Sequence, residues 1–202
     1  QVEVSLVRGF AFMAPREEFE RIGKCKVERN RLVFDCSQES AERKFNLLLA
    51  KYLPQLKTKI TGNSATYIHR NSGIPLTGSN QFGLVYRNTS IIEVKPQTSC
   101  NLDCVYCSVG EGLSSDQNDF IVERSYLLEE FKKLAQFVGQ PVEAHIGIQG
   151  EPFFYAELLD LIADLHVLDN VYKISMDTNG TLLSEGIIDK LSLFPKVRLN
   201  IS

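Results

Sequence analysis

Residues 90–202 alternate short apolar runs with amphipathic segments, and this order restricts the fold more than any other feature of the chain. Strands are predicted at 91–94, 144–148, 171–176 and 197–201, and helices at 123–138, 155–168 and 182–194. Repeated strand–helix–strand units favour an α/β fold whose strands pair in parallel through right-handed crossovers. In such sheets, ligands bind at the carboxyl ends of the strands.

Polar or unusual segments follow the first three predicted strands at that edge, and a polar pair ends the fourth. They are the cysteine segment 100–107, the segments 149–152 and 177–180, and the pair Asn200 and Ser202. Alternation along 197–202 places Arg198, Asn200 and Ser202 on one face of the last strand, opposite three apolar residues. The sequence therefore predicts one ligand site that is assembled from four strand ends.

The cysteine segment holds Cys100, Cys104 and Cys107 in a C-x3-C-x2-C spacing. An odd total of five cysteines does not predict a disulfide framework, and a tight cluster in a reducing compartment favours metal binding. Structural zinc requires four ligands, whereas three thiolates hold three irons of a 4Fe–4S cluster and leave the fourth iron open. Cys25 and Cys36 would complete a zinc site only if the N-terminal residues folded over this segment. We therefore expect a 4Fe–4S cluster.

The residues CNLDCVYC at 100–107 resemble the C-x3-C-x-aromatic-C motif of the radical S-adenosylmethionine (SAM) enzymes. QGEP at 149–152 is similar to their GGEP segment, with Gln149 in place of the first glycine, and DTNG at 177–180 is similar to their third strand end. The loop and TNG also resemble the branch that contains the molybdenum-cofactor cyclase and the peptide-modifying enzymes. The resemblance covers about residues 90–202 and implies a partial parallel (β/α) barrel with four of six strands visible. The chain is accordingly expected to be part of a longer protein.

The resemblance also implies which residues bind the cofactors. Cys100, Cys104 and Cys107 would ligate the cluster, and SAM would chelate the open iron. An electron from an external flavodoxin- or ferredoxin-type donor would then cleave SAM to a 5′-deoxyadenosyl radical, which abstracts hydrogen from an unidentified substrate. The residues expected around SAM are Tyr106 near the adenine, Gln149, Gly150, Glu151 and Pro152 at the amino group, and Thr178, Asn179, Asn200 and Ser202 on the carboxylate and ribose side.

Several of these residues also have ordinary structural explanations. Gly-Glu-Pro is a common helix entry, Asn-Gly is a common turn dipeptide, and Tyr106 would cover a cluster without contacting adenine. Glu93 and Lys95 share a face of the first strand and are as well explained by an internal ion pair. His145 is expected to be a structural histidine, so none of these last three residues is assigned a catalytic role.

The first ninety residues show a different pattern. Residues 1–60 predict a small α+β domain with a hairpin around Arg29 and Asn30 and a helix at 37–53. Residues 61–89 are rich in Gly, Asn, Ser and Thr and predict an irregular linker that wraps the next domain. Residues 1–60 carry 12 Lys and Arg against 8 Asp and Glu, an ordinary surface excess that leaves a peptide, RNA or metabolite open as the partner.

The alternative function is a non-catalytic iron–sulfur or zinc protein that carries electrons, senses or acts as a scaffold. Four protein ligands in the assembled site would favour it, whereas the open fourth position and the polar ends of three further strands favour an enzyme. No run of 18 apolar residues and no secretory leader is visible, so a cytoplasmic protein without a membrane span is expected.

Overall fold

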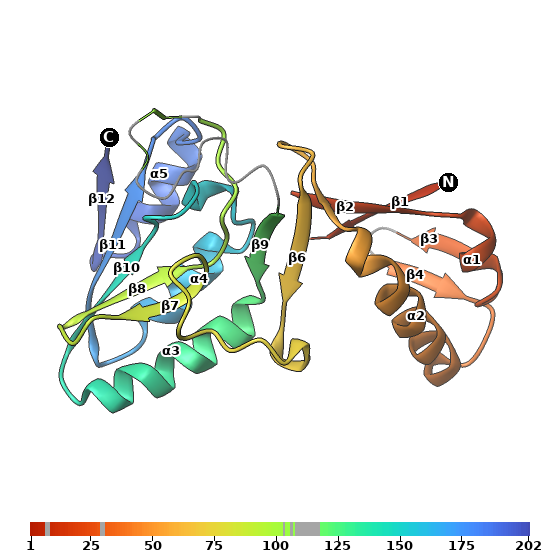
Figure 1. Cartoon of the computed structure of the whole chain (residues 1–202), viewed down its shortest axis with the longest axis horizontal. Helices are drawn as coiled ribbons and strands as arrows, with labels where there is room; N and C mark the ends of the chain where they lie inside the picture. The colour runs from red at the N-terminus through yellow and green to blue at the C-terminus, as the bar shows by residue number, and fades with distance from the viewer. Residues whose placement is uncertain (7–8, 29–30, 103, 106, 108–117) are drawn as a thin grey trace.

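The computed structural model describes residues 1–6, 9–28, 31–102, 104, 105, 107 and 118–202 and has mixed α/β architecture (Figure 1). In these ranges the strands form two five-stranded sheets and one two-stranded hairpin. One sheet has the strand order β1-β2-β5-β6-β9, and the other has the order β12-β11-β10-β8-β7. Parallel pairs occur in both sheets and predominate in the second.

The second sheet contains the four strands expected from the sequence. They are β8 (Ile91–Lys95), β10 (Val142–Ile146), β11 (Val171–Thr178) and β12 (Val197–Ile201). These strands lie side by side in chain order, and each neighbouring pair is parallel, so the predicted parallel arrangement is confirmed. A strand that the sequence did not predict, β7 (Gly83–Tyr86), adds an antiparallel edge beside β8.

Helices cover the apolar face of this sheet. They are α3 (Arg124–Val138), α4 (Leu158–His166) and α5 (Glu185–Ser192). Strand alternation turns Ile92, Ile146 and Met176 to this face, where each is 0% exposed. Helix α3 ends at Gly139, whose φ of +69° is the left-handed conformation that glycine adopts at a helix C-terminus. Ser184 is the N-cap residue of α5, but its side chain makes no capping hydrogen bond.

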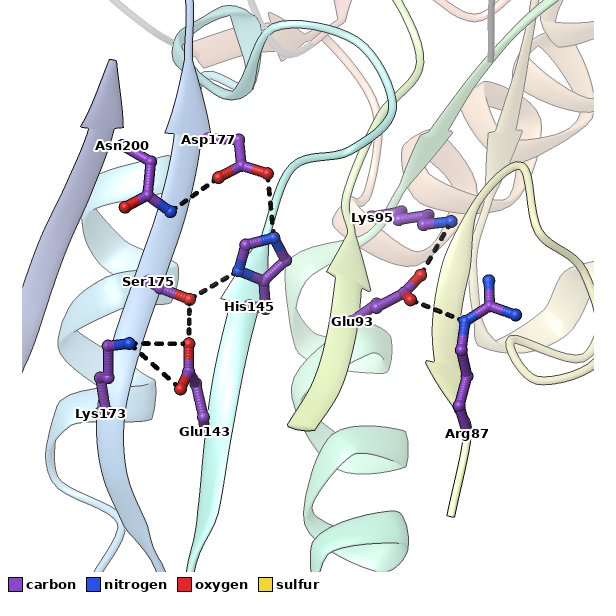
Figure 2. Close-up of polar contacts among 9 residues, drawn as sticks. All are labelled: Arg87, Glu93, Lys95, Glu143, His145, Lys173, Ser175, Asp177 and Asn200. Atoms are coloured by element: carbon purple, nitrogen blue, oxygen red, sulfur yellow. Dashed lines mark hydrogen bonds and ion pairs between the residues drawn. The ribbon is translucent and has the colours of Figure 1, made fainter. Parts of the chain in front are cut away.

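The opposite face of the same sheet is polar. Its side chains come from all four parallel strands and are Glu93, Lys95, Glu143, His145, Lys173, Ser175, Asp177, Arg198 and Asn200. Figure 2 shows hydrogen bonds and ion pairs that join most of them. The ion pair anticipated between Glu93 and Lys95 is present, with Lys95 Nζ 3.2 Å from Glu93 Oε2. Parallel sheets usually bury apolar side chains on both faces, so this face is suited to a polar ligand rather than to a second helical layer.

The N-terminal residues supply most of the first sheet and the elements around it, and β9 adds a strand from beyond the cysteine segment. The strands are β1 (Val2–Leu6), β2 (Phe10–Ala14), β5 (Lys57–Thr58), β6 (Ser64–Ile68) and β9 (Asn118–Val122). Around it lie α1 (Arg16–Glu20), the hairpin strands β3 (Cys25–Glu28) and β4 (Arg31–Phe34), α2 (Gln38–Tyr52), and the 3₁₀ turns η1 (Leu53–Gln55) and η2 (Arg70–Ser72).

Helix α2 begins at an N-cap, Ser37, whose Oγ accepts from Ser40 N at 3.4 Å. It packs on β2 through Tyr52, which stacks on Phe12 with ring centroids 6.0 Å apart. None of the helices in the described ranges is long and apolar enough to cross a membrane.

Residues 61–89 are more regular than the sequence predicted, because β6, η2 and β7 lie within them. Strand β6 pairs in parallel with β9, which follows the cysteine segment, from Ser64 opposite Asn118 to Ile68 opposite Val122. The expectation of an irregular linker is therefore wrong for the residues that form β6, η2 and β7. The pairing also means that the chain leaves one sheet at the end of β8, passes the cysteines, and enters the other sheet at β9 (Figure 1).

Candidate functional site

The carboxyl ends of the four parallel strands meet at one pocket of about 340 Å³. Its lining residues are Cys100, Leu102, Cys104, Cys107, Ile148, Gly150, Glu151, Asp177, Thr178, Asn179 and Ser202. The structure thus brings the cysteine segment together with residues from the ends of the other three strands. Gln149, Pro152 and Asn200 lie next to lining residues but are not part of the wall, and Tyr106 lies outside the described residues.

The described residues of the cysteine segment that line the pocket are Cys100, Leu102, Cys104 and Cys107. Cys107 N donates to Cys104 O at 2.9 Å, and Leu102 N donates to Cys100 Sγ at 3.4 Å. Burial raises the pKa of the Cys100 thiol, because the thiolate is less well solvated there than in water. Cys25 and Cys36 belong to the region of the β3–β4 hairpin and do not line this pocket.

Within the described ranges, no three Cys, His, Asp or Glu side chains converge on a point that would hold one metal ion. The three thiols that line one pocket match in number and kind the ligands of a 4Fe–4S cluster, in which each thiolate binds a different iron. Tetrahedral structural zinc would take four protein ligands.

The segment after β10 reaches the pocket through an unusual backbone. Gly147, Ile148 and Gly150 have φ values of +117°, +69° and +67°. A β-branched residue in the left-handed region is strained, and Ile148 holds this conformation while lining the pocket. At Gly150 a Cβ would lie 2.7 Å from the main-chain atoms of Thr98 and Ser99. Only glycine allows the two segments to approach this closely, directly before Cys100.

Glu151 joins three strand ends and is only 2% exposed. Its Oε1 accepts from Phe153 N at 3.1 Å and from Thr178 Oγ1 at 2.7 Å, and its Oε2 accepts from Asn179 N at 2.9 Å. Its main-chain N donates to Ser99 O at 2.9 Å. The carboxylate that was expected to contact SAM thus also holds the segment after β11 in place. Pro152 begins the 3₁₀ turn η3 (Pro152–Phe154), where its missing N–H costs nothing.

A hydrogen-bonded triad that sequence analysis missed connects the cysteine segment to the end of β11. Asn179 Nδ2 donates to Asn101 Oδ1 at 2.9 Å, and Asn101 Nδ2 donates to Thr181 Oγ1 at 2.8 Å. Thr181 Oγ1 in turn donates to Asn179 Oδ1 at 2.7 Å, and Asn179 Nδ2 also lies 3.9 Å from Cys100 Sγ. The only sequence signal was that Asn101 lies within the cysteine motif and that Thr181 directly follows DTNG.

The fourth strand end contributes less to the wall than predicted. Asn200 Nδ2 donates to Asp177 Oδ1 at 2.8 Å, so Asn200 supports the pocket through Asp177. Ser202 lines the pocket, and its main-chain N donates to Thr178 O at 3.2 Å. Gln97, which the sequence did not single out, is 1% exposed, and its Nε2 donates to both Ser99 O and Glu151 O.

Comparison with known proteins gives a family and several relatives. Residues 94–202 match the Radical SAM superfamily. The uncharacterized protein MJ0103 of Methanocaldococcus jannaschii is 40% identical over 162 residues, which are 78% of this chain and 37% of that protein. The protein named GTP 3′,8-cyclase is 29% identical over 116 residues in Clostridium botulinum, covering 57% of this chain and 35% of the relative. The chain therefore spans about a third of the length of these relatives. No solved structure shows significant similarity.

Proposed function

Because the chain belongs to the Radical SAM superfamily, we propose that the pocket at the strand ends binds a 4Fe–4S cluster and SAM for radical chemistry on a substrate. The observation that carries this proposal is the grouping of three cysteines with Gly150, Glu151 and Asn179 around one pocket. When bound, these cofactors supply a 5′-deoxyadenosyl radical that removes a hydrogen atom from the substrate, and the electron comes from a flavodoxin- or ferredoxin-type donor.

In this proposal the chain holds and orients the cofactors. Cys100, Cys104 and Cys107 ligate three irons, and binding metal deprotonates thiols such as Cys100, whose burial otherwise favours the protonated form. Because Gly150 has no side chain, the 149–152 segment can pack closely against Ser99, the residue before Cys100. Asn179, which contacts both Asn101 and the Cys100 thiol, links the cluster side of the pocket to the predicted SAM side.

The proposal extends to the fold. We infer that the second sheet is part of a parallel (β/α) barrel whose further strands adjoin β12, and that residues 1–60 form a small α+β domain beside it. The match of residues 94–202 to the Radical SAM superfamily and the greater length of the relatives support the first inference. The name of the clostridial relative makes GTP the first candidate substrate to assay.

The experiment is anaerobic reconstitution of the chain with iron and sulfide, followed by electron paramagnetic resonance (EPR) of the reduced protein with and without SAM. We expect a reduced 4Fe–4S signal that changes when SAM is added. Cys104→Ala should abolish the signal, whereas the matched control, Cys25→Ala combined with Cys36→Ala, should retain it because these cysteines lie away from the pocket.

Two results would contradict the proposal. A cluster whose spectrum ignores SAM would favour an electron carrier, sensor or scaffold. Bound zinc without iron after reconstitution would favour a structural metal site.

A further inference from the structure

Four side chains of the polar face form one continuous hydrogen-bonded chain that ends at the pocket (Figure 2). Ser175 Oγ donates to Glu143 Oε1, His145 Nδ1 lies 2.6 Å from Ser175 Oγ, and His145 Nε2 lies 3.0 Å from Asp177 Oδ2. Ser175 is 1% exposed and the His145 side chain 16%. The Asp177 side chain is 43% exposed and lines the pocket, so this end of the hydrogen-bonded series of side chains faces the pocket.

The number of protons in this chain is set by its contacts. Three contacts join four groups, and each needs one proton between its heavy atoms. Ser175 supplies one proton and a neutral imidazole supplies one, so the neutral groups fill only two contacts. With a neutral His145, two lone pairs would face each other either at Ser175 or at Asp177. A doubly protonated His145 fills all three contacts, with Nε2–H toward Asp177 and Nδ1–H toward Ser175.

The extra proton does not reside on Glu143. Burial acts to raise the pKa of Glu143, but hydrogen bonds from Ser175 and Lys173 outweigh it and hold the pKa below its ordinary value. Lys173 Nζ lies 3.1 Å from Glu143 Oε1 and 3.2 Å from its Oε2. Glu143 is therefore a carboxylate that accepts the Ser175 proton, and the proton between His145 and Asp177 stays on the stronger base, the imidazole.

The other charged groups around His145 are occupied with partners of their own. From β8, Glu93 is in register with His145, but its carboxylate pairs with Arg87 Nε at 2.9 Å and with Lys95 Nζ at 3.2 Å. From β12, the Arg198 guanidinium donates to main-chain carbonyls of its own strand. Asp177 is thus the direct ionic partner of the imidazolium among the described residues.

We propose that His145 is held in its doubly protonated form and, with Asp177, makes an acid site on the pocket wall. In transfer, Asp177 Oδ2 first accepts the Nε2 proton and then passes that proton to the ligand, which leaves Asp177 a carboxylate again, and solvent returns a proton to the neutral imidazole. Such a site suits a substrate with a hydroxyl, amine or carbonyl group beside the reacting carbon. The inference that such a substrate binds in this pocket rests on the proposed function. The protonation of His145 does not depend on the proposed function.

The test is a ¹⁵N nuclear magnetic resonance spectrum of the full chain, labelled at histidine, at neutral pH. The chain has three histidines, and His145→Gln identifies the signal of interest. His69 is the internal reference for a ring nitrogen that accepts, because its Nδ1 accepts from Asn71 N at 3.3 Å. We expect both His145 nitrogens to be protonated. A neutral tautomer in the unaltered chain would overturn the proposal.

A matched pair of variants distinguishes the effect of this ion pair on His145 protonation from the effect of general surface charge. Asp177→Asn keeps the shape of the side chain but removes its charge, so most of the His145 signal should convert to the neutral form at the same pH. Asp189→Asn removes an exposed carboxylate of α5 and should leave His145 unchanged. An Asp177→Asn spectrum identical to that of the unaltered chain would also overturn the proposal. Failure of the EPR experiment above would defeat the proposed function without altering this result, so the two are distinguishable.

Discussion

Replacement of Gly150 by alanine should destabilise the chain more than replacement of any freely exposed glycine. The new Cβ would lie 2.7 Å from Thr98 C, Thr98 O and Ser99 O, all main-chain atoms that cannot rotate away. Ser99 is also held by Glu151 N, which donates to its carbonyl at 2.9 Å. The left-handed φ of +67° adds about 1–2 kcal/mol, and the forced displacement adds about 1–3 kcal/mol. We therefore expect a loss of about 2–5 kcal/mol of unfolding free energy.

Urea unfolding measures this loss, and Gly73→Ala is the matched control. Gly73 has almost the same φ, +70°, but a Cβ there would meet nothing within 4 Å, so only the conformational cost of about 1–2 kcal/mol applies. With a urea slope of about 2 kcal/mol per molar, Gly150→Ala should lower the midpoint by about 1–2.5 M. The displaced Thr98–Ser99 backbone precedes Cys100, so reconstituted iron should fall as well. Equal losses in the two variants would refute the close-approach argument.

Three further predictions concern other parts of the chain. Asp119→Ala should cost about 3 kcal/mol in urea unfolding, because Asp119 is 0% exposed and accepts from threonine hydroxyls, including Thr58 Oγ1, that would lose their partner. The lowered pKa of Glu143 means that its ionised form stabilises the fold above the ordinary glutamate pKa, and this stabilisation is lost as the pH falls through the folded pKa. Glu143→Gln should therefore flatten the acid side of a plot of melting temperature against pH. Gly186→Ala, in α5 with nothing within 4 Å of the new Cβ, should raise the melting temperature by about 1–3 °C, and a decrease would contradict the helix-propensity argument.

The parallel sheet was predictable because its strands are short apolar runs between amphipathic helices. In contrast, β6 and β9 are flanked by polar sequence, and they pair with each other, a contact between distant residues that no local pattern reports. For the same reason residues 61–89 were expected to be irregular. Composition indicates where a chain turns easily, but the partner decides whether a polar segment becomes a strand.

The candidate site was predictable as a set of segments rather than as a set of contacts. Spacing identified Cys100 and its neighbours, and strand order brought the polar ends to one edge. The internal role of the Glu151 carboxylate depends on the path of two loops, which sequence spacing does not determine. Likewise, His145 was expected to be structural, because the protons of its hydrogen-bonded chain can be counted only when both of its partners are known.

The pairing of β6 with β9 has a consequence for the order in which the chain is made. Residues 64–68 leave the ribosome well before residues 118–122, so the growing chain carries β6 with one unpaired edge while β8 and the cysteines are still being synthesised. An open edge of this kind can pair with another chain. The native strand that closes it arrives directly after the cysteine segment. Completion of the first sheet therefore has to wait until the cysteine segment has been synthesised, and a delay at this point of synthesis prolongs the exposure of the edge.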